Sequence, residues 1–354
     1  YLLACIAFSL WSIKDFAAPY VWVALAWAIV LVHAAVTLKK PAVRLMCFNL
    51  ACAALVLGGV EGWLQCKKLP DNRHHVDTMA DYIDHNDALG YAPRPGVQTY
   101  ARKYYGDKLV YDVTYTFDEH GHRLSNSDEE GDDAALFFGC SFTFGEGVDD
   151  YQAMPYRVSE LAGHRNRVHN FAFSGYGPHQ MLAAIENGLV DQLNIQPKIA
   201  IYQGLLHHVN RSAGLAVWDR RGPQYQLTRD GDVRYAGPFS RETQGSLAID
   251  EVMYQLRKSL LVRRVVDRPT AVRPEHVELY LGIVDRARTL IEQRYPGCAF
   301  HVLLWDNPDD PLREQVVRGL RSRGLRVHLV SDIHPDLVRD KFRISPYDPH
   351  PNPQ

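Results

Sequence analysis

The sequence lacks the cysteine pattern of a disulfide-stabilised domain. Such a framework needs paired cysteines at regular spacings in a short extracellular chain. Among 354 residues only six cysteines occur, three in apolar segments and three scattered farther along: Cys5, Cys47, Cys52, Cys66, Cys140 and Cys298. The cysteines therefore do not indicate a compartment. A chain of this length is long enough for about two domains and one sizeable hydrophobic core.

An excess of charge and a pattern of metal ligands are also missing. With 39 basic and 41 acidic residues, the net charge is −2, which gives no basis for nucleic-acid binding. His74 and His75 are adjacent, so they point in different directions on any regular element, and no third ligand is suitably spaced. We therefore expect no nucleic-acid partner, no metal and no cofactor.

Charged residues are rare in the first 64 positions. Tyr20 to Leu38 runs nineteen residues without a charge, and at 1.5 Å per residue such a helix spans roughly 28 Å of hydrocarbon. Leu45 to Val60 is a second apolar run, and Tyr1 to Ile13 reads as the remainder of a further helix. We predict transmembrane helices over residues 1–66, two of them clear and one truncated. The alternatives are a buried core hairpin and a cleaved signal peptide, which fits less well because no small-residue cleavage site follows the first run.

The loop between the two clear helices predicts the orientation of the chain. It is short and basic, with Lys39, Lys40 and Arg44, and short basic loops remain cytoplasmic. The second helix then leaves the cytoplasm, and everything from Cys66 onward lies outside, although two lysines just past the helix favour the opposite orientation. We expect a cell-membrane protein that contacts lipid through these helices, with its remaining part on the extracytoplasmic side.

Residues 67–133 form a polar connector followed by a β-rich leader. Apolar residues alternate with aspartate and threonine over residues 108–117, the period-two pattern of a half-buried strand. Residues 96–105 precede it as a second strand. We expect this small leader to pack on the main domain.

From Ala134 the pattern becomes strand, helix, strand, helix, which is typical of a parallel sheet with crossover helices. The strands are short, continuous apolar runs, so both faces of the sheet are covered. We predict strands at 134–139, 167–173, 198–204, 298–305 and 325–331, and helices near 152–163, 178–193, 276–294 and 312–323. Within the insertion 211–273 we predict a hairpin at 225–235 and a helix around 247–266. It is either a lid or acceptor-binding flap, or a structural insertion without a role.

Polar residues follow several predicted strands, at the edge where ligands bind in open parallel sheets. Ser141 comes directly after the first strand, in "FFGCSFTFGEGV", and a helix beginning there would leave free backbone N–H groups beside its hydroxyl. A nucleophilic serine needs a base and an acid to orient that base. His350 and Asp348 of the terminal "SPYDPHPN" supply both, and Gly175 can expose a backbone N–H.

These motifs resemble the SGNH family of hydrolases, also called the GDSL family, over residues 134–352. "GCSFTFGEG" resembles the first block, "NFAFSGYG" the second and "DPHPN" the last. The resemblance implies a flavodoxin-like three-layer α/β/α sandwich over 134–354 and serine esterase activity on short, acetyl-like acyl esters, inferred to be esters of carbohydrate. It further implies Ser141 as nucleophile, His350 as base, Asp348 as orienting acid, and the N–H groups of Ser141 and Gly175 as oxyanion donors.

The sequence departs from this family pattern in its first and third blocks. Cys140 stands where the family has an aspartate, and a Cys140 nucleophile is an alternative to Ser141, although a cysteine at an apolar strand end is more often buried and inert. The third block lacks its asparagine, so we predict His208 as the substitute oxyanion donor. The residues expected to contact substrate are its neighbours His207, Asn210 and Arg211.

The last block departs in its spacing. Asp348 is two residues before His350, where the family commonly has three, so Asp306 or Asp332 could orient the base instead. Asp332 and His334 are a second candidate pair.

Two other functions remain open at this stage. The first is a polysaccharide O-acyltransferase with the same triad, in which the insertion binds a sugar acceptor through Trp218, Tyr225, Arg234 and Tyr235. The second is a weakly active or inactive module for binding or assembly that keeps the fold, because two motif blocks are altered. The sequence identifies no protein partner.

Overall fold

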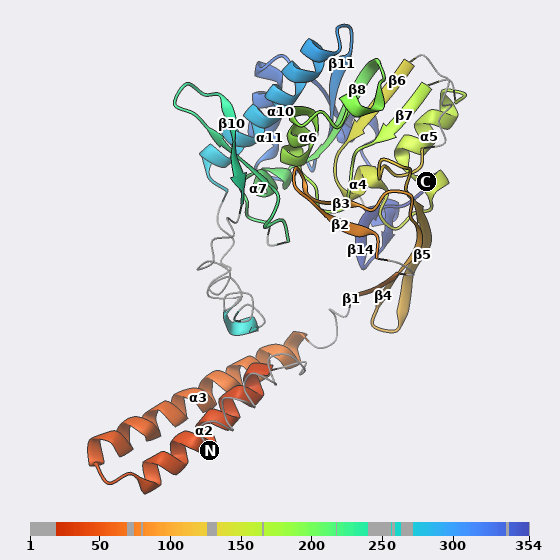
Figure 1. Ribbon diagram of the computed structural model, residues 1–354. Coiled ribbons are helices and arrows are strands. Elements are labelled where there is room, and N and C mark those ends of the chain that lie inside the picture. Colours follow the sequence, from red (N-terminus) through yellow and green to blue (C-terminus); the bar gives the residue numbers. More distant parts are fainter. Residues whose placement is uncertain are drawn as a thin grey trace. The chain divides into compact units, whose positions relative to one another are not determined.

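The computed structural model of this chain consists of two units (Figure 1). One contains residues 1–72 and 242–270, and the other contains residues 73–241 and 271–354. The structure describes residues 19–68, 74–78, 81–125, 133–164, 166–216, 218–239, 256, 259–262, 272–337 and 340–353.

In the first unit, two apolar helices pack against each other. They are α2 (Pro19–Thr37) and α3 (Pro41–Lys68). Tyr20–Thr37 and Pro41–Cys66 are long and apolar enough to cross a membrane, a test of length and composition that some core helices and signal sequences also meet. Many of their large apolar side chains are exposed. The predicted helix remnant at Tyr1–Ile13 lies outside the described residues.

A buried carboxylate links α3 to part of the predicted insertion within this first unit. Glu61 is 2% exposed, and its carboxylate accepts hydrogen bonds from Ser259 Oγ at 2.8 Å and from the N–H groups of Leu260 and Leu261 at 2.9 Å. These partners satisfy a charge that would otherwise be costly to bury. Apart from residues 256 and 259–262, the helix expected around 247–266 lies outside the described residues.

The second unit is built on a five-stranded parallel sheet, as the sequence predicts. Its strands lie in the order β12-β11-β8-β6-β7, and every neighbouring pair is parallel. Numbered along the chain from β6, this is the 2-1-3-4-5 order of flavodoxin-like folds, in which the order reverses between the first and third strands. The strands are β6 (Asp133–Phe138), β7 (Asn166–Asn170), β8 (Pro197–Leu205), β11 (Ala299–Trp305) and β12 (Arg326–Leu329).

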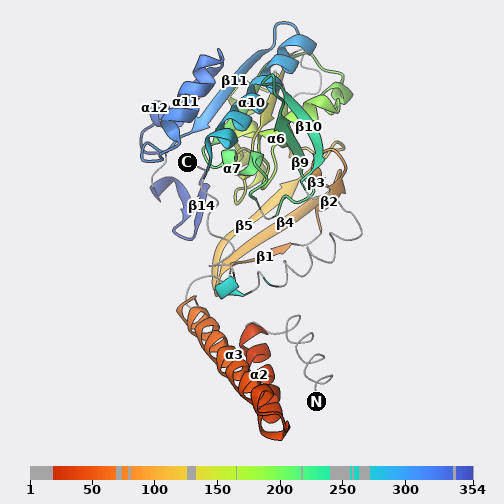
Figure 2. The ribbon, with the colours of Figure 1, turned by 90° about the vertical axis from the view of Figure 1, so that its left-hand side faces the viewer.

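Helices cover both faces of this sheet (Figures 1 and 2). On one face, α6 (Pro178–Glu186), α10 (Pro274–Arg294) and α11 (Arg313–Ser322) pack over the main core, with α10 in contact with the other two. On the other face, Met154 at the start of α5 (Met154–Leu161) packs against Ala135, Phe137 and Val168. Successive strand residues point to opposite faces, so β6 contributes Leu136 and Phe138 to the main core and Phe137 to the smaller one.

The leader forms a three-stranded antiparallel sheet in the order β1-β4-β5. The alternation predicted for residues 108–117 is confirmed from Tyr111 onward, because Tyr111, Val113 and Tyr115 are buried in the main core. Leu109, expected on the same face, is exposed. Past the end of β5, Phe117 bridges to Arg123, which in turn bridges to Asn170 of β7. The strands are β1 (His74–Thr78), β4 (Gln98–Tyr105) and β5 (Lys108–Thr116), with β2 (Ile83–Asn86) and β3 (Gly90–Pro93) pairing separately.

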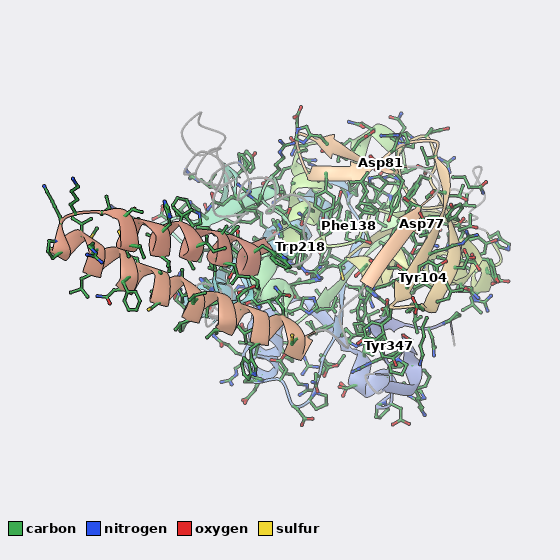
Figure 3. All side chains as sticks on the ribbon, turned by 90° about the horizontal axis from the view of Figure 1, so that it is seen from below. Asp77, Asp81, Tyr104, Phe138, Trp218 and Tyr347 are labelled. Atoms are coloured by element: carbon green, nitrogen blue, oxygen red, sulfur yellow. The ribbon has the colours of Figure 1, made fainter. Side chains whose placement is uncertain are left out.

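Two hairpins complete this unit. The hairpin predicted at 225–235 is confirmed as β9 (Pro223–Leu227) paired with β10 (Val233–Pro238). At the end of the chain, β13 (Arg343–Ser345) pairs with β14 (Asp348–Pro351), and this terminal hairpin packs against β5. Tyr347 lies in the turn of this terminal hairpin and stacks on Tyr105 of β4, with the two ring centres 4.0 Å apart. Figure 3 labels Tyr347 together with Tyr104, the neighbour of Tyr105 on β4.

Candidate active site

Ser141 lies at the point where the strand order of the sheet reverses. Strand β6 ends at Phe138, labelled in Figure 3, and the short helix α4 (Ser141–Phe144) begins with the serine itself. Gly139 makes this sharp turn possible, because a Cβ there would lie 2.1 Å from Thr143 Oγ1. Thr143 Oγ1 donates to Gln203 Oε1 of the neighbouring β8. The serine therefore stands at the carboxyl end of a central strand, where open α/β sheets bind ligands.

The structure brings together the three residues predicted as a catalytic triad. His350 Nε2 is 2.9 Å from Ser141 Oγ, and His350 Nδ1 is 2.5 Å from Asp348 Oδ1. All three side chains are largely buried. The distance between Ser141 and His350 is that of a nucleophile and its general base. The arrangement has the geometry for acyl transfer, and the catalytic roles themselves stay a prediction.

The terminal hairpin explains why a spacing of two residues suffices between acid and base. Asp348 and His350 lie on β14, and residues i and i+2 of a strand point to the same face. The carboxylate also accepts the His350 backbone N–H at 3.0 Å, which fixes its orientation. A spacing of three would place the two side chains on opposite faces of this strand.

Asp306, an alternative orienting acid, and His334, the alternative base, have other partners. Asp306 accepts hydrogen bonds from the backbone and hydroxyl of Ser331 and pairs with Arg313 at 2.7 Å. The ring of His334 lies against Phe342, and its Nδ1 accepts the Asp336 N–H at 3.3 Å. It is Asp348, and neither of these alternatives, that the structure places against His350.

A lysine from the leader completes the charge arrangement, and no sequence pattern pointed to it. Lys103 Nζ of β4 lies 2.7 Å from Asp348 Oδ2, and its side chain is largely buried. Burial alone would raise the pKa of Asp348, but hydrogen bonds from His350 and Lys103 hold that pKa well below its usual range. The carboxylate is therefore ionised at neutral pH and oriented from both sides. In the sequence of β4, no pattern distinguishes this lysine from its polar neighbours.

A buried arginine of the leader organises the loop that follows Ser141. The guanidinium of Arg123 donates to the carbonyls of Phe144 at 2.6 Å and Val148 at 2.6 Å, and also to the carbonyl of Gly145. It pairs with Asp150 at 2.9 Å. These carbonyls belong to the last residue of the four-residue helix α4 and to residues after it, so they have few helical partners. Sequence reasoning missed this residue, because the only sign was an arginine next to a strand.

A glutamate from the same loop faces the base. Glu146 Oε2 is 3.8 Å from His350 Nε2 and accepts a hydrogen bond from Ser174 Oγ at 2.7 Å. Ser174 precedes Gly175, whose φ of +83° favours glycine. A Cβ on Gly175 would lie 2.5 Å from the Tyr91 hydroxyl and 2.7 Å from Trp218 Nε1. This second loop is therefore held close to the Ser141 loop, and only glycine fits at 175.

His208, predicted as the substitute oxyanion donor, is fully buried and already has partners at both ring nitrogens. Its Nδ1 lies 2.8 Å from the Tyr202 hydroxyl and accepts the Leu205 N–H at 3.4 Å, while Nε2 lies 3.4 Å from Arg211 Nη1. Burial lowers its pKa well below the ordinary value. The ring is completely buried and does not reach a surface where substrate could bind, so the described geometry gives His208 a packing role.

The three predicted substrate contacts differ from one another in the structure. Arg211 is buried, donates to the Tyr176 carbonyl and lies 5.6 Å from the ring centre of Trp218. His207 Nε2 is 3.0 Å from Arg211 Nη2, and burial lowers the His207 pKa to about 4. Asn210 Oδ1 is buried with no partner among the described residues. Arg211 thus holds the second loop at Tyr176.

Cys140, the alternative nucleophile, is completely buried. Burial raises the pKa of its thiol, against the opposing effect of the nearby Arg211 charge. A thiol must ionise to attack an ester effectively. The environment of Cys140 therefore favours an inert thiol, whereas the neighbouring serine hydroxyl contacts the base.

No family model matches the chain, and no curated protein matches its sequence. Among solved structures, the lipase Lip_vut3 from a goat rumen metagenome is similar at 13% identity and a TM-score of 0.33, covering 62% of this chain and 89% of that one. LAE5, an alpha/beta hydrolase enzyme from the metagenome of Lake Arreo, has 14% identity and a TM-score of 0.33, with 63% and 88% covered. The acetyl xylan esterase Est2A from Butyrivibrio proteoclasticus has 12% identity and a TM-score of 0.31, with 65% and 64% covered. At this distance none of them assigns an activity to this chain, whose site has to be judged on its own geometry.

Proposed function

We propose that this protein is a serine ester hydrolase of the SGNH type, anchored in a membrane by its N-terminal helices. Residues 134–354 would form the catalytic domain and residues 67–133 its connector and leader. The observation that carries the proposal is the continuous contact from Ser141 Oγ through His350 to Asp348, with distances of 2.9 and 2.5 Å. The location of this contact at the reversal point of the strand order supports it further.

The geometry supports a two-step acyl transfer. Ser141 Oγ attacks the ester carbonyl while His350 Nε2 takes its proton, and the imidazolium that forms is stabilised by Asp348. His350 then returns the proton to the leaving alcohol as the carbon–oxygen bond breaks, which leaves an acyl group on Ser141. Water attacks this intermediate in the second step, with His350 as the base. The N–H groups of Ser141 and Gly175 are the proposed oxyanion donors.

We infer that the substrate is a short acyl ester of a carbohydrate. Trp218 is 57% exposed and donates through Nε1 to the Gly175 carbonyl at 3.3 Å, so its ring lies beside a proposed oxyanion donor. An exposed aromatic ring offers an apolar face for a sugar ring and a polar edge for hydrogen bonding. A membrane anchor with the catalytic domain on the extracytoplasmic side would place the enzyme near surface polysaccharides.

The test uses the full chain in detergent with 4-nitrophenyl acetate and with acetylated oligosaccharides. We expect turnover of both, loss of turnover in Ser141→Ala, and unchanged turnover in Ser322→Ala, a serine on the surface of α11. If Ser141→Ala hydrolyses the esters as fast as the wild type, the proposal is wrong. Reporter fusions after Leu89 test the orientation, and activity of the reporter in the cytoplasm would reverse it.

Transfer of the acyl group to a sugar is the second candidate, and the exposed ring of Tyr235 on the β9–β10 hairpin favours it. The same acyl-serine would be attacked by a sugar hydroxyl instead of water. An activated acetyl donor is supplied with and without oligosaccharide, and acetylated sugar is measured against free acetate. If the wild type and a Tyr235→Ala variant both give acetate alone, the protein is a plain esterase.

A further inference from the structure

A group of metal-ligating side chains lies outside the site described above, where the leader meets the edge of the sheet. Asp118 and His122 flank the turn that follows β5, and His169 lies on β7, the edge strand of the parallel sheet (Figure 1). Each of the three offers one ligand atom, and these atoms lie within 4.8 Å of one another. We propose that Asp118, His122 and His169 bind a divalent transition metal, of which Zn²⁺ fits best, and that this metal fastens the leader to β7.

The backbone holds the three residues in place without using the atoms that a metal would need. Asp118 Oδ1 accepts the N–H groups of His120 and His122 at 2.9 and 2.7 Å. The second carboxylate oxygen, Oδ2, is directed to the histidine side, 3.9 Å from His122 Nδ1. Across the turn, the Asp118 N–H donates to the His122 carbonyl at 2.9 Å. The turn is therefore closed by its own hydrogen bonds, and one oxygen remains for a ligand.

Two imidazole nitrogens at this place have no protein partner. His122 Nδ1 and His169 Nε2 are buried and make no hydrogen bond to any residue that the structure describes. Buried polar atoms without partners are uncommon and costly. The two rings lie 5.9 Å apart and nearly perpendicular, and the His122 ring also lies 4.1 Å from Phe171. A metal ion would satisfy both nitrogens at once.

The chemistry of the donor set favours zinc. Two imidazoles and one carboxylate are typical zinc ligands, at about 2.0–2.2 Å, with the fourth tetrahedral position left for water. In a tetrahedral zinc site the ligand atoms are roughly 3.3–3.5 Å apart. Small side-chain rotations would bring the three ligand atoms, which now lie within 4.8 Å of one another, to that separation.

The position suggests what the metal does. His122 immediately precedes Arg123, whose guanidinium holds the loop after Ser141, and Arg123 bridges to Asn170, the neighbour of His169. Metal binding would fix this junction from the opposite side of both strands. The expected role is stabilisation of the leader on the sheet, and Asp118, His122 and His169 take no part in the ester chemistry.

The test measures Zn²⁺ retained by the purified full chain after chelator treatment, reloading with zinc chloride and desalting. We expect one zinc per chain, a rise in Tm of several degrees that EDTA reverses, and the visible absorption of tetrahedral Co²⁺ when cobalt replaces zinc. His169→Ala and Asp118→Asn should bind at least tenfold more weakly and show no zinc-dependent rise in Tm. Asp118→Asn keeps an oxygen that can accept the two backbone N–H groups, so it preserves the turn.

The matched control is His301→Ala, at the opposite side of the same sheet. His301 Nδ1 lies 2.8 Å from His328 Nε2, and the centres of their stacked rings are 5.1 Å apart. Among the described residues, this pair does not belong to any group of three possible metal ligands. This variant should retain zinc as the wild type does. Wild-type protein that retains no zinc, or His169→Ala protein that retains a full equivalent, would overturn the proposal. Neither result depends on ester turnover, so the proposed function is tested separately.

Discussion

Among the described residues of this unit, two histidine–aspartate pairs have atoms no more than 2.6 Å apart, and only one of the two faces a nucleophile. His350 and Asp348 lie 2.5 Å apart on one strand, with the second ring nitrogen on Ser141. His179 and Asp219 lie 2.6 Å apart, and both side chains are fully buried. The ring of His179 packs against Phe239, and its Nδ1 is buried with no partner among the described residues. A short contact between histidine and carboxylate is therefore no sign of catalysis by itself.

The two pairs differ in what surrounds the carboxylate. Lys103 Nζ lies 2.7 Å from Asp348 Oδ2, the carboxylate oxygen that does not contact His350. Asp219 receives Gln180 at 2.8 Å on the same oxygen that contacts His179, while its other oxygen is buried without a partner in the described structure. The first pair is held from two sides and keeps one nitrogen for the serine. The second pair joins α6 to the segment that follows the short helix α7 (His208–Ser212), which is a structural arrangement.

The largest expected effect is at Ser141, the nucleophile that only the first pair contacts. Ser141→Ala should lower kcat/KM for 4-nitrophenyl acetate by about 10⁴- to 10⁶-fold, because triad members act as a unit. Cys140→Ala should retain most of the activity, since its buried thiol contacts no base. Steady-state kinetics on both variants check this. The reverse ranking would assign the nucleophile to Cys140.

Matched substitutions test the comparison directly. His350→Leu should lower kcat/KM by about 10³-fold or more with little change in Tm. His179→Leu should leave kcat unchanged but lower the free energy of unfolding by about 1–3 kcal/mol, because it removes a buried hydrogen-bond partner of Asp219. Kinetics and urea unfolding are measured on each variant. A loss of turnover in folded His179→Leu protein would show that both pairs serve the reaction.

A smaller effect is expected at the lysine that distinguishes the first pair. Lys103→Met should lower kcat by about 10-fold with KM nearly unchanged, since Lys103 orients Asp348 and does not contact substrate. Lys103→Arg should recover part of the activity. Lys108→Met is the control, because Lys108 lies on the same leader hairpin but contacts the Tyr347 ring, at 5.6 Å. Equal losses in Lys103→Met and Lys108→Met would argue against a role for the ion pair.

The smallest expected effect is the pH dependence of stability at Asp348. Its pKa in the folded protein lies below the value of about 3.9 for an unfolded chain. The ionised form therefore stabilises the fold above about pH 4, and this contribution is lost as the pH falls through the folded pKa. The Tm difference between wild type and Asp348→Asn should narrow as the pH falls below about 4. A difference that grows below about pH 4 would contradict the assignment.

Much of the sheet and of the serine's position could be predicted from the sequence, because both depend on local patterns. Continuous apolar runs predicted the five parallel strands, and the place of Ser141 after the first of them predicted its location at the sheet's carboxyl edge. The approach of His350 to Ser141 was also predicted, from the order of motifs along the chain. The first two inferences use residues that are close in sequence or a known rule of strand order, whereas the third joins residues 209 positions apart and came from the resemblance of the motifs to a known family.

The contributions of the leader could not be predicted in the same way. Lys103 lies 245 positions before Asp348, and Arg123 is 21 positions before the first carbonyl that it holds. Contacts of this kind depend on how the leader packs on the sheet, which no periodicity reports. His208, whose ring was expected to face the substrate, is a different case, because its neighbours Tyr202 and Arg211 are only six and three positions away. Its ring is fully buried beyond the end of β8, and the residue types alone did not indicate that burial.

The most direct test of the central claim is covalent labelling of the full chain with a fluorophosphonate, followed by intact mass measurement and peptide mapping. We predict one adduct per chain, on Ser141, with none in Ser141→Ala, a strongly reduced rate in His350→Leu, and a wild-type rate in folded His179→Leu. The rate should differ between the two histidine variants because only His350 contacts the serine. An unlabelled wild-type protein, or an adduct on any residue other than Ser141, would contradict the assignment of this site as a serine esterase.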